Sequence, residues 1–169
     1  RLDFATGLGN WVFTDDATGT YRDGAEDVTY TYSLKDLKVG DMPQFNLALG
    51  TTVSPIEGAK IQALYRFYAL HYADWGVSSR EGGEDRNQVW KTPSYGVLDL
   101  HASYDLPLEF GSAKPSLFLH VFNALDETYI QDATDNSSYN AWSDTHSASD
   151  AEVFFGMPTS FNLGLRINF

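Results

Sequence analysis

The last nine residues of the chain alternate strictly between apolar and polar side chains. The apolar positions are Phe161, Leu163, Leu165, Ile167 and Phe169, and asparagine, glycine or arginine fills the gaps between them. Successive side chains of a β-strand point to opposite faces, so this alternation predicts a strand with one apolar face and one polar face.

Similar alternation recurs upstream. Aromatic residues make up 15% of the chain and 14 glycines interrupt it, a composition that favours strands and turns over helices. The first segment is interrupted by glycine and the fifth has bulky residues on both faces, so these two fit the pattern least well. We expect an all-β, antiparallel fold with six long strands, over residues 2–13, 44–54, 60–72, 95–106, 116–123 and 159–169.

The connections between these segments alternate between short and long. The short ones, at residues 54–58 and 107–115, contain the proline and glycine of tight turns. Most of the 23 acidic residues lie in or beside the long connections, which cover residues 14–43, 74–93 and 128–158. Short turns at one end and long loops at the other are typical of bacterial outer-membrane barrels. Within the first long connection, Asp23-Gly24 predicts a small hairpin.

Charge and composition exclude several functions. The net charge is −12 with only 11 lysine and arginine residues, so we expect no nucleic-acid partner. There is no cysteine, which excludes disulfides and thiolate metal sites. No apolar run reaches the ~18–20 residues of a spanning helix, and no signal peptide is recognised. A membrane location stays compatible with the sequence, because barrel strands need only ~9–11 residues of alternating polarity.

Three motifs resemble the carboxy-terminal end of TonB-dependent outer-membrane receptors. They are TPSYGVLDL at residues 92–100, VFNALDETYI at residues 121–130 and FGMPTSF at residues 155–161. Their order and spacing extend the resemblance over nearly the whole chain. Thr159 and Ser160 depart from the family pattern, in which an arginine commonly precedes the final strand. Residues 37–44 and 72–75 are most similar to the large receptors that carry an N-terminal carboxypeptidase-regulatory-like domain.

The resemblance implies a fold, a location and partners. The fold would be an antiparallel transmembrane β-barrel of about 22 strands around a plug, and residues 1–169 would supply its six carboxy-terminal strands. The location would be the bacterial outer membrane. The partners would be membrane lipid, the remainder of the barrel and its plug, the barrel-assembly machinery, and the TonB energy-coupling complex, which acts through the amino-terminal part.

The function that the resemblance implies is TonB-dependent uptake of a scarce nutrient, such as a siderophore, a glycan or a peptide. This part of the receptor would form barrel wall and extracellular loops, without enzymatic chemistry or a cofactor. Two alternatives make other predictions. A barrel kept as a scaffold in an envelope complex would need no TonB-binding segment, and a small self-contained β-barrel binder would be a stable soluble monomer.

Two sets of residues are candidates for recognition. In the family, a terminal aromatic residue preceded by alternating apolar residues is the insertion signal, here Phe161, Leu163, Leu165, Ile167 and Phe169. The alternative is an ordinary strand that ends on a core residue. Aromatic residues of the long connections would stack on a sugar or an aromatic siderophore, or else form an interfacial girdle or plain loop packing; they are Trp75, Trp90, Tyr139 and Trp142.

Oxygen ligands gather in the last long connection. Asp132, Asp135 and Asn136 would suit calcium, but the glycine and terminal glutamate of an EF-hand are missing, and a solvated loop is the simpler interpretation. No zinc site is expected, because no metal-ligand spacing relates the histidines, which are His71, His101, His120 and His146. We expect no enzyme, because neither a glycine-flanked nucleophile nor a phosphate-binding loop is recognised.

Overall fold

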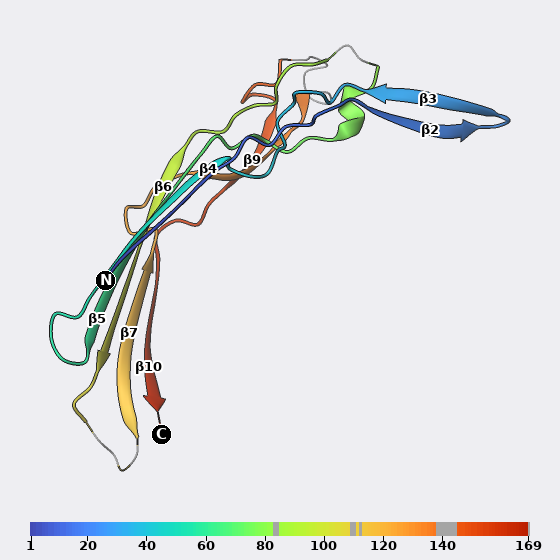
Figure 1. Ribbon diagram of the computed structural model, residues 1–169. Helices are drawn as coiled ribbons and strands as arrows, with labels where there is room; N and C mark the ends of the chain where they lie inside the picture. Colours follow the sequence, from blue (N-terminus) through green and yellow to red (C-terminus); the bar gives the residue numbers. More distant parts are fainter. Residues whose placement is uncertain (83–84, 109–110, 112, 138–144, 169) are drawn as a thin grey trace.

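The computed structural model describes residues 1–169 except 83–84, 109–110, 112, 138–144 and 169 (Figure 1). The chain is all-β with antiparallel sheets, which confirms the all-β, antiparallel part of the expected fold. In the described part, no helix is long and apolar enough to span a membrane. The elements are β1 (Leu2–Leu8), β2 (Ala17–Asp23), β3 (Glu26–Tyr32), β4 (Phe45–Val53), β5 (Ala59–Ala69), the 3-10 helix η1 (Val77–Arg80), β6 (Tyr95–Asp105), β7 (Lys114–Phe122), β8 (Ile130–Asp135), β9 (Ala151–Phe155) and β10 (Ser160–Asn168).

Six strands form one antiparallel sheet in the order β1-β4-β5-β6-β7-β10. They occupy the six segments in which the side chains alternate, and the bounds of the last five differ from the predicted ones by no more than 3 residues. β1 and β10 form the two edges, and within the described residues the sheet does not close into a barrel.

The first strand is shorter than predicted. It ends at Leu8, whereas the sequence predicted a strand, interrupted by glycine, over residues 2–13. Gly9 lies against the indole of Trp11, where a Cβ atom would come within 2.7 Å of Cε2. Beyond Gly9 the backbone turns to the 37–39 segment: the Phe13 N–H donates to the Leu37 carbonyl, and the Val39 N–H donates to the Trp11 carbonyl. Residues 9–13 therefore leave the sheet at the glycine.

Short and long connections segregate to opposite ends of the sheet, as Figure 1 shows. In the turn at residues 54–58, the Ala59 N–H donates to the Ile56 carbonyl. Gly58 has a φ of 78°, and a Cβ atom on it would lie 3.0 Å from the Asp105 carbonyl oxygen. Glycine is therefore required at this turn both by the backbone conformation and by the close neighbouring strand.

Two smaller hairpins arise from the long connections. β2 pairs with β3 through a turn in which Gly24 has a φ of 61°, at the Asp23-Gly24 position that predicts a hairpin. The rings of Tyr21 and Tyr30 stack across this hairpin at 5.2 Å. The hairpin projects away from the rest of the chain (Figure 1). The second hairpin pairs β8 with β9 and was not predicted.

Most of the buried apolar residues lie among the connections, and Val97 of β6 is the buried apolar residue of the large sheet among the described residues. Leu34, Leu37, Trp75 and Val89 form the cluster, and Phe13, Tyr32 and Tyr72 pack against it. Burial stabilises such contacts by about 25 cal/mol per Å² of apolar surface, so the long connections hold one another in place. We name the described parts of residues 9–44, 70–94 and 123–159 the loop assembly.

Candidate functional site: a two-faced sheet and its loop assembly

The strand register gathers one set of side chains on a single face of the six-stranded sheet. Ile61, Ala102, Leu119 and Leu163 form a row straight across β5, β6, β7 and β10. By the same pairing, this face comprises the even-numbered residues of β1 and β6 and the odd-numbered residues of β4, β5, β7 and β10. None of these residues is charged. We name this surface the apolar face.

The apolar face is widely exposed. Phe161 is 77% exposed, and Leu163 and Phe4 are each 69% exposed. The buried cluster lies in the loop assembly, so in the described part of the chain no layer covers this face. Soluble monomers rarely expose contiguous apolar patches larger than about 300–600 Å², and larger patches mark surfaces that contact a partner or a membrane.

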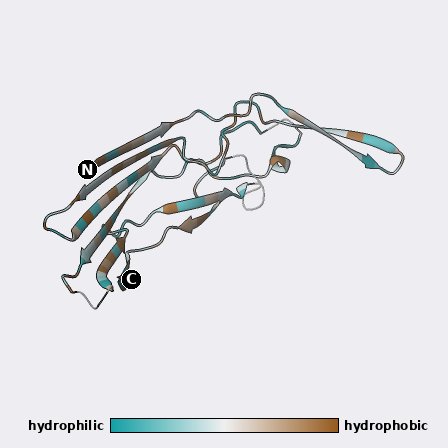
Figure 2. Cartoon of the chain, turned by 60° about the horizontal axis from the view of Figure 1, so that its bottom comes forward, coloured by the Kyte–Doolittle hydropathy of each residue, from teal (hydrophilic) through white to brown (hydrophobic). Residues whose placement is uncertain are grey.

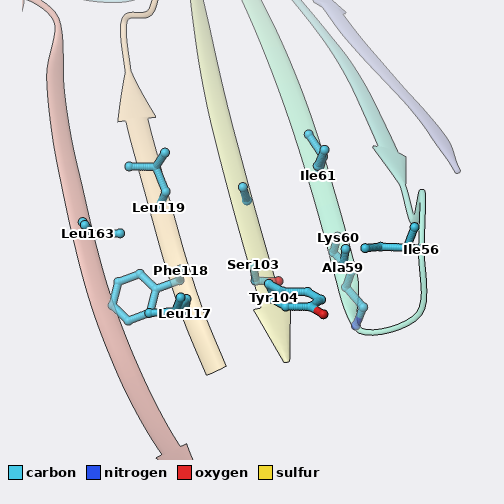
Figure 3. Close-up of a pocket in the computed structure, with 11 residues that line it drawn as sticks. Ile56, Ala59, Lys60, Ile61, Ser103, Tyr104, Leu117, Phe118, Leu119 and Leu163 are labelled. Atoms are coloured by element: carbon cyan, nitrogen blue, oxygen red, sulfur yellow. The ribbon is translucent and has the colours of Figure 1, made fainter. Parts of the chain in front are cut away.

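A shallow hollow of about 340 Å³ lies on the apolar face near the short turns (Figure 3). It forms because the small side chain of Ala102 lies between Ile61 and Leu119 on the neighbouring strands. Leu117 of β7 and Leu163 of β10 also line the hollow. Most of its lining is hydrocarbon, so the hollow is a dent in the apolar face and offers little to hold a polar ligand.

The opposite, polar face carries every charged side chain of the six strands: Asp3, Lys60, Arg66, Asp99, Asp105, Lys114 and Arg166. Figure 2 shows the resulting hydrophilic and hydrophobic bands along the strands. Arg66 forms an ion pair with Asp99, which is 4% exposed. His101 and His120 face each other with their Nδ1 atoms 2.8 Å apart.

Phe118 explains why the fifth predicted strand has bulky residues on both faces. It lies on the polar face opposite Gly164 of β10, where a Cβ atom would come within 2.2 Å of its Cζ. The guanidinium of Arg166 lies 5.7 Å from the centre of its ring. The ring therefore fills the space that the glycine leaves and is covered by an arginine side chain.

The residues that follow β7 form a hydrogen-bonded corner. Asn123 and Asp126 have φ values of 48° and 52°, a conformation that these two residue types tolerate better than most. The Asn123 amide group donates to the carbonyls of Glu127 and Met157, at 2.9 and 3.1 Å. The Asp126 carboxylate accepts the N–H and the hydroxyl of Thr159, and these bonds lower its pKa. The corner ties the end of β7 to the start of β10.

The three motifs that carry the family resemblance meet at this corner. Asp99 of the first motif accepts the backbone N–H of Asn123, in the second motif, at 3.0 Å. Tyr129 of the second motif stacks on Tyr95 of the first at 4.4 Å. Its ring also covers Gly156 of the third motif, where a Cβ atom would lie 1.9 Å from the ring. The motif residues therefore fix the path of the chain into the last strand.

A buried ionic network joins the second and third long connections. The His146 ring lies between Asp135, at 2.5 Å from Nδ1, and Asp85, at 2.7 Å from Nε2. Asp85 also pairs at 2.7 Å with Arg80, whose guanidinium lies over the ring of Trp75. The histidine ring bridges two carboxylates from separate connections, and the arginine supplies a positive charge beside one of them. The sequence did not predict this network, because Asp85 lies 61 positions from His146 and no spacing pattern relates the members.

The aromatic candidates for ligand contact are not gathered at one exposed surface in the described residues. Trp75 is 8% exposed, donates from Nε1 to the Lys38 carbonyl at 3.2 Å and contacts Phe13 edge-on at 5.5 Å. Trp90 is half-buried and accepts the Ala73 N–H at its carbonyl. Tyr139 and Trp142 lie outside the described residues. The rings of the two described tryptophans belong to the loop assembly.

The three residues considered for calcium contact different partners. Asp135 binds His146 and the Ser137 hydroxyl, and Asn136 donates to Glu152. Asp132 lies on the other side of the strand, near Asp41 and His71. In the insertion-signal set, Phe161, Leu163, Leu165 and Ile167 all lie on the apolar face, and Phe169 lies outside the described residues.

Comparisons of the chain with protein-family models, with curated proteins and with solved structures found no match. The fold and the geometry of the sheet and loop assembly are therefore the basis for the function proposed below.

Proposed function

We propose that the chain forms part of the wall and the extracellular loops of an outer-membrane β-barrel that imports a scarce nutrient with energy from TonB. The apolar face carries this proposal. It extends across six neighbouring strands without one charged residue, while all charges of those strands lie on the opposite face. A bilayer against one side and a hydrated, filled lumen against the other would satisfy both surfaces.

The strand lengths support the same environment. β5 and β6 have 11 residues each, and β4, β7 and β10 have 9 each. Tilted strands of about 9–11 residues are long enough to cross the hydrocarbon core of a bilayer. The short turns would lie on the periplasmic side and the loop assembly outside the cell, which is the usual arrangement in such barrels.

The open edges of the sheet are consistent with further strands in a complete barrel. β1 and β10 each have a neighbour on one side only. In hydrocarbon, unpaired backbone N–H and C=O groups are too costly to leave at an edge, so a membrane-spanning sheet must continue until it closes. The last strand would pair with the first strand of the whole barrel, and a plug would fill the lumen.

The polar groups of this chain would serve binding and positioning, and no step of covalent chemistry is assigned to them. Siderophores, glycans and peptides are all compatible with a loop assembly that carries most of the acidic residues of the chain. Energy would arrive through the TonB complex acting on parts of the receptor outside this chain, and the barrel-assembly machinery would insert the protein.

The proposal is tested with the full-length protein in cells with and without a functional TonB complex. Uptake of a ferric siderophore, a glycan and a peptide is measured with each radiolabelled. We expect the protein in the outer-membrane fraction, and accumulation of one ligand class that requires both the receptor and TonB. Recovery in the soluble fraction would overturn the membrane assignment, and membrane localisation without any TonB-dependent uptake would favour the scaffold alternative.

A further inference from the structure

Three side chains that could hold a metal ion converge in the loop assembly: Asp41, which is exposed, His71, which is buried, and Asp132, which is half-buried. Asp41, His71 and Asp132 each offer one ligand atom, and these atoms all lie within 4.8 Å of one another. Each residue comes from a different long connection of the chain. They are at least 30 positions apart in sequence, which is why no ligand spacing is visible there.

The backbone around His71 holds these connections together. The Asp41 N–H donates to the Tyr72 carbonyl at 3.0 Å, and the Asp74 N–H donates to the Ala133 carbonyl at 2.7 Å. The neighbour of Asp41 is Gly40, and a Cβ atom on it would lie 2.5 Å from the Ala73 carbonyl oxygen. Glycine therefore permits the close approach that brings Asp41 to the His71 segment.

His71 is a buried polar group without a partner among the described residues. Its side chain belongs to a residue that is 5% exposed, and neither ring nitrogen makes a hydrogen bond to any described residue. Buried polar side-chain atoms in proteins nearly always have a partner, so this pair of nitrogens needs an explanation. Burial lowers the pKa of His71, which favours the neutral imidazole that binds metal ions.

The two carboxylates supply the charge that a cation needs. The pKa of Asp41 is raised first by a hydrogen bond with Asp132 and further by desolvation and by the Asp132 charge, as expected for two acidic groups that lie close together. Asp74 adds a third negative charge nearby. A divalent ion between the carboxylates would replace their mutual repulsion by attraction to a common centre.

We propose that Asp41, His71 and Asp132 bind one divalent transition-metal ion, which cross-links the three long connections. One imidazole nitrogen with two carboxylate oxygens suits ions such as Zn²⁺ and Mn²⁺. Ligand distances of about 2.0–2.2 Å would place the ligand atoms of a tetrahedral site about 3.4 Å apart. The three atoms lie within 4.8 Å of one another, so side-chain rotations that move each atom by about 1 Å would complete the site. Three protein ligands leave one position or more for water or for an oxygen atom of a ligand.

The test measures binding of Zn²⁺ and of Mn²⁺ to the full-length protein by equilibrium dialysis, with metal quantified by mass spectrometry. The variants are Asp41→Asn and His71→Ala, and the matched control is Asp36→Asn. Asp36 and Asp41 lie in the same connection with φ values of 67° and 68°, so asparagine is equally tolerated at both. We expect the control to keep the affinity of the parent protein for the metal ion. Both test variants should bind the ion at this site with an affinity at least about tenfold lower.

Three results would overturn the proposal. They are the absence of transition-metal binding in the parent protein, equal binding by Asp41→Asn and Asp36→Asn, and binding of Ca²⁺ in preference to both transition metals. Hydrogen exchange of the β8–β9 hairpin, measured with and without Zn²⁺, shows whether the ion orders the connections even where a variant folds less well. The metal site does not depend on the proposed transport, because it rests on the loop assembly alone.

Discussion

Replacing Leu163 with arginine tests what lies against the apolar face. Leu163 is near the middle of the nine residues of β10, opposite Leu119, and is 69% exposed. Against hydrocarbon, an arginine close to the bilayer midplane lowers the free energy of unfolding by about 2–4 kcal/mol. Against water, a substitution at so exposed a position changes it by less than about 0.5 kcal/mol. The two environments therefore predict effects that differ severalfold.

The assay is guanidinium unfolding of the full-length protein in phospholipid vesicles, followed by tryptophan fluorescence. Asn162→Arg is the matched control, because Asn162 is the adjacent residue and points to the polar face, opposite His120. We expect Leu163→Arg to be destabilised and Asn162→Arg to stay within about 0.5 kcal/mol of the parent. Equal free energies for the two arginine variants would refute the assignment of the faces.

Three further predictions concern the loop assembly and the corner. His146→Ala removes the hydrogen-bond partner that Asp85 and Asp135 share and lowers the stability of the β8–β9 hairpin by about 1–3 kcal/mol, measured by hydrogen exchange, whereas Ser149→Ala has little effect. The hydrogen bond from Arg86 lowers the pKa of Asp16 from 3.8 to about 2. The contribution of the ionised Asp16 carboxylate to the free energy of unfolding is therefore complete above about pH 4 and is lost as the pH falls toward 2. In acid-unfolding curves, Asp16→Asn should be less stable than the parent protein at pH 6 and equally stable below pH 2. Gly156→Ala forces a Cβ atom into the ring of Tyr129 and costs about 1–3 kcal/mol, and the loss should shrink in a Tyr129→Ala background.

The regular part of the fold was predictable because its signal is local. Alternation with a period of two reports the environment of both faces of a strand, and it located β4, β5, β6, β7 and β10. The overprediction of β1 has a local cause as well. The predicted segment continued past Gly9 although glycine interrupts its pattern, but the indole of Trp11 occupies the space beside that glycine, and the backbone leaves the sheet there.

The interior of the loop assembly was not predictable in the same way. The His146 network joins residues 61 and 11 positions apart, and the Asp41–His71–Asp132 cluster joins three separate connections. Such contacts depend on how long connections pack against one another, and no periodic pattern encodes that packing. The β8–β9 hairpin was missed for a related reason: its strands are 6 and 5 residues long and are shifted in register at Ile130 and Asp132.

The most direct test of the account is a spin-label scan of residues 160–168 in the full-length protein in lipid bilayers. This chain has no cysteine, so each position in it can be labelled singly once any cysteine elsewhere is removed. We expect collision with oxygen, which concentrates in lipid, to peak at 161, 163, 165 and 167, and collision with a water-soluble nickel chelate to peak at the residues between them. Equal access of the chelate to both sets of positions would contradict the claim that the apolar face lies against lipid.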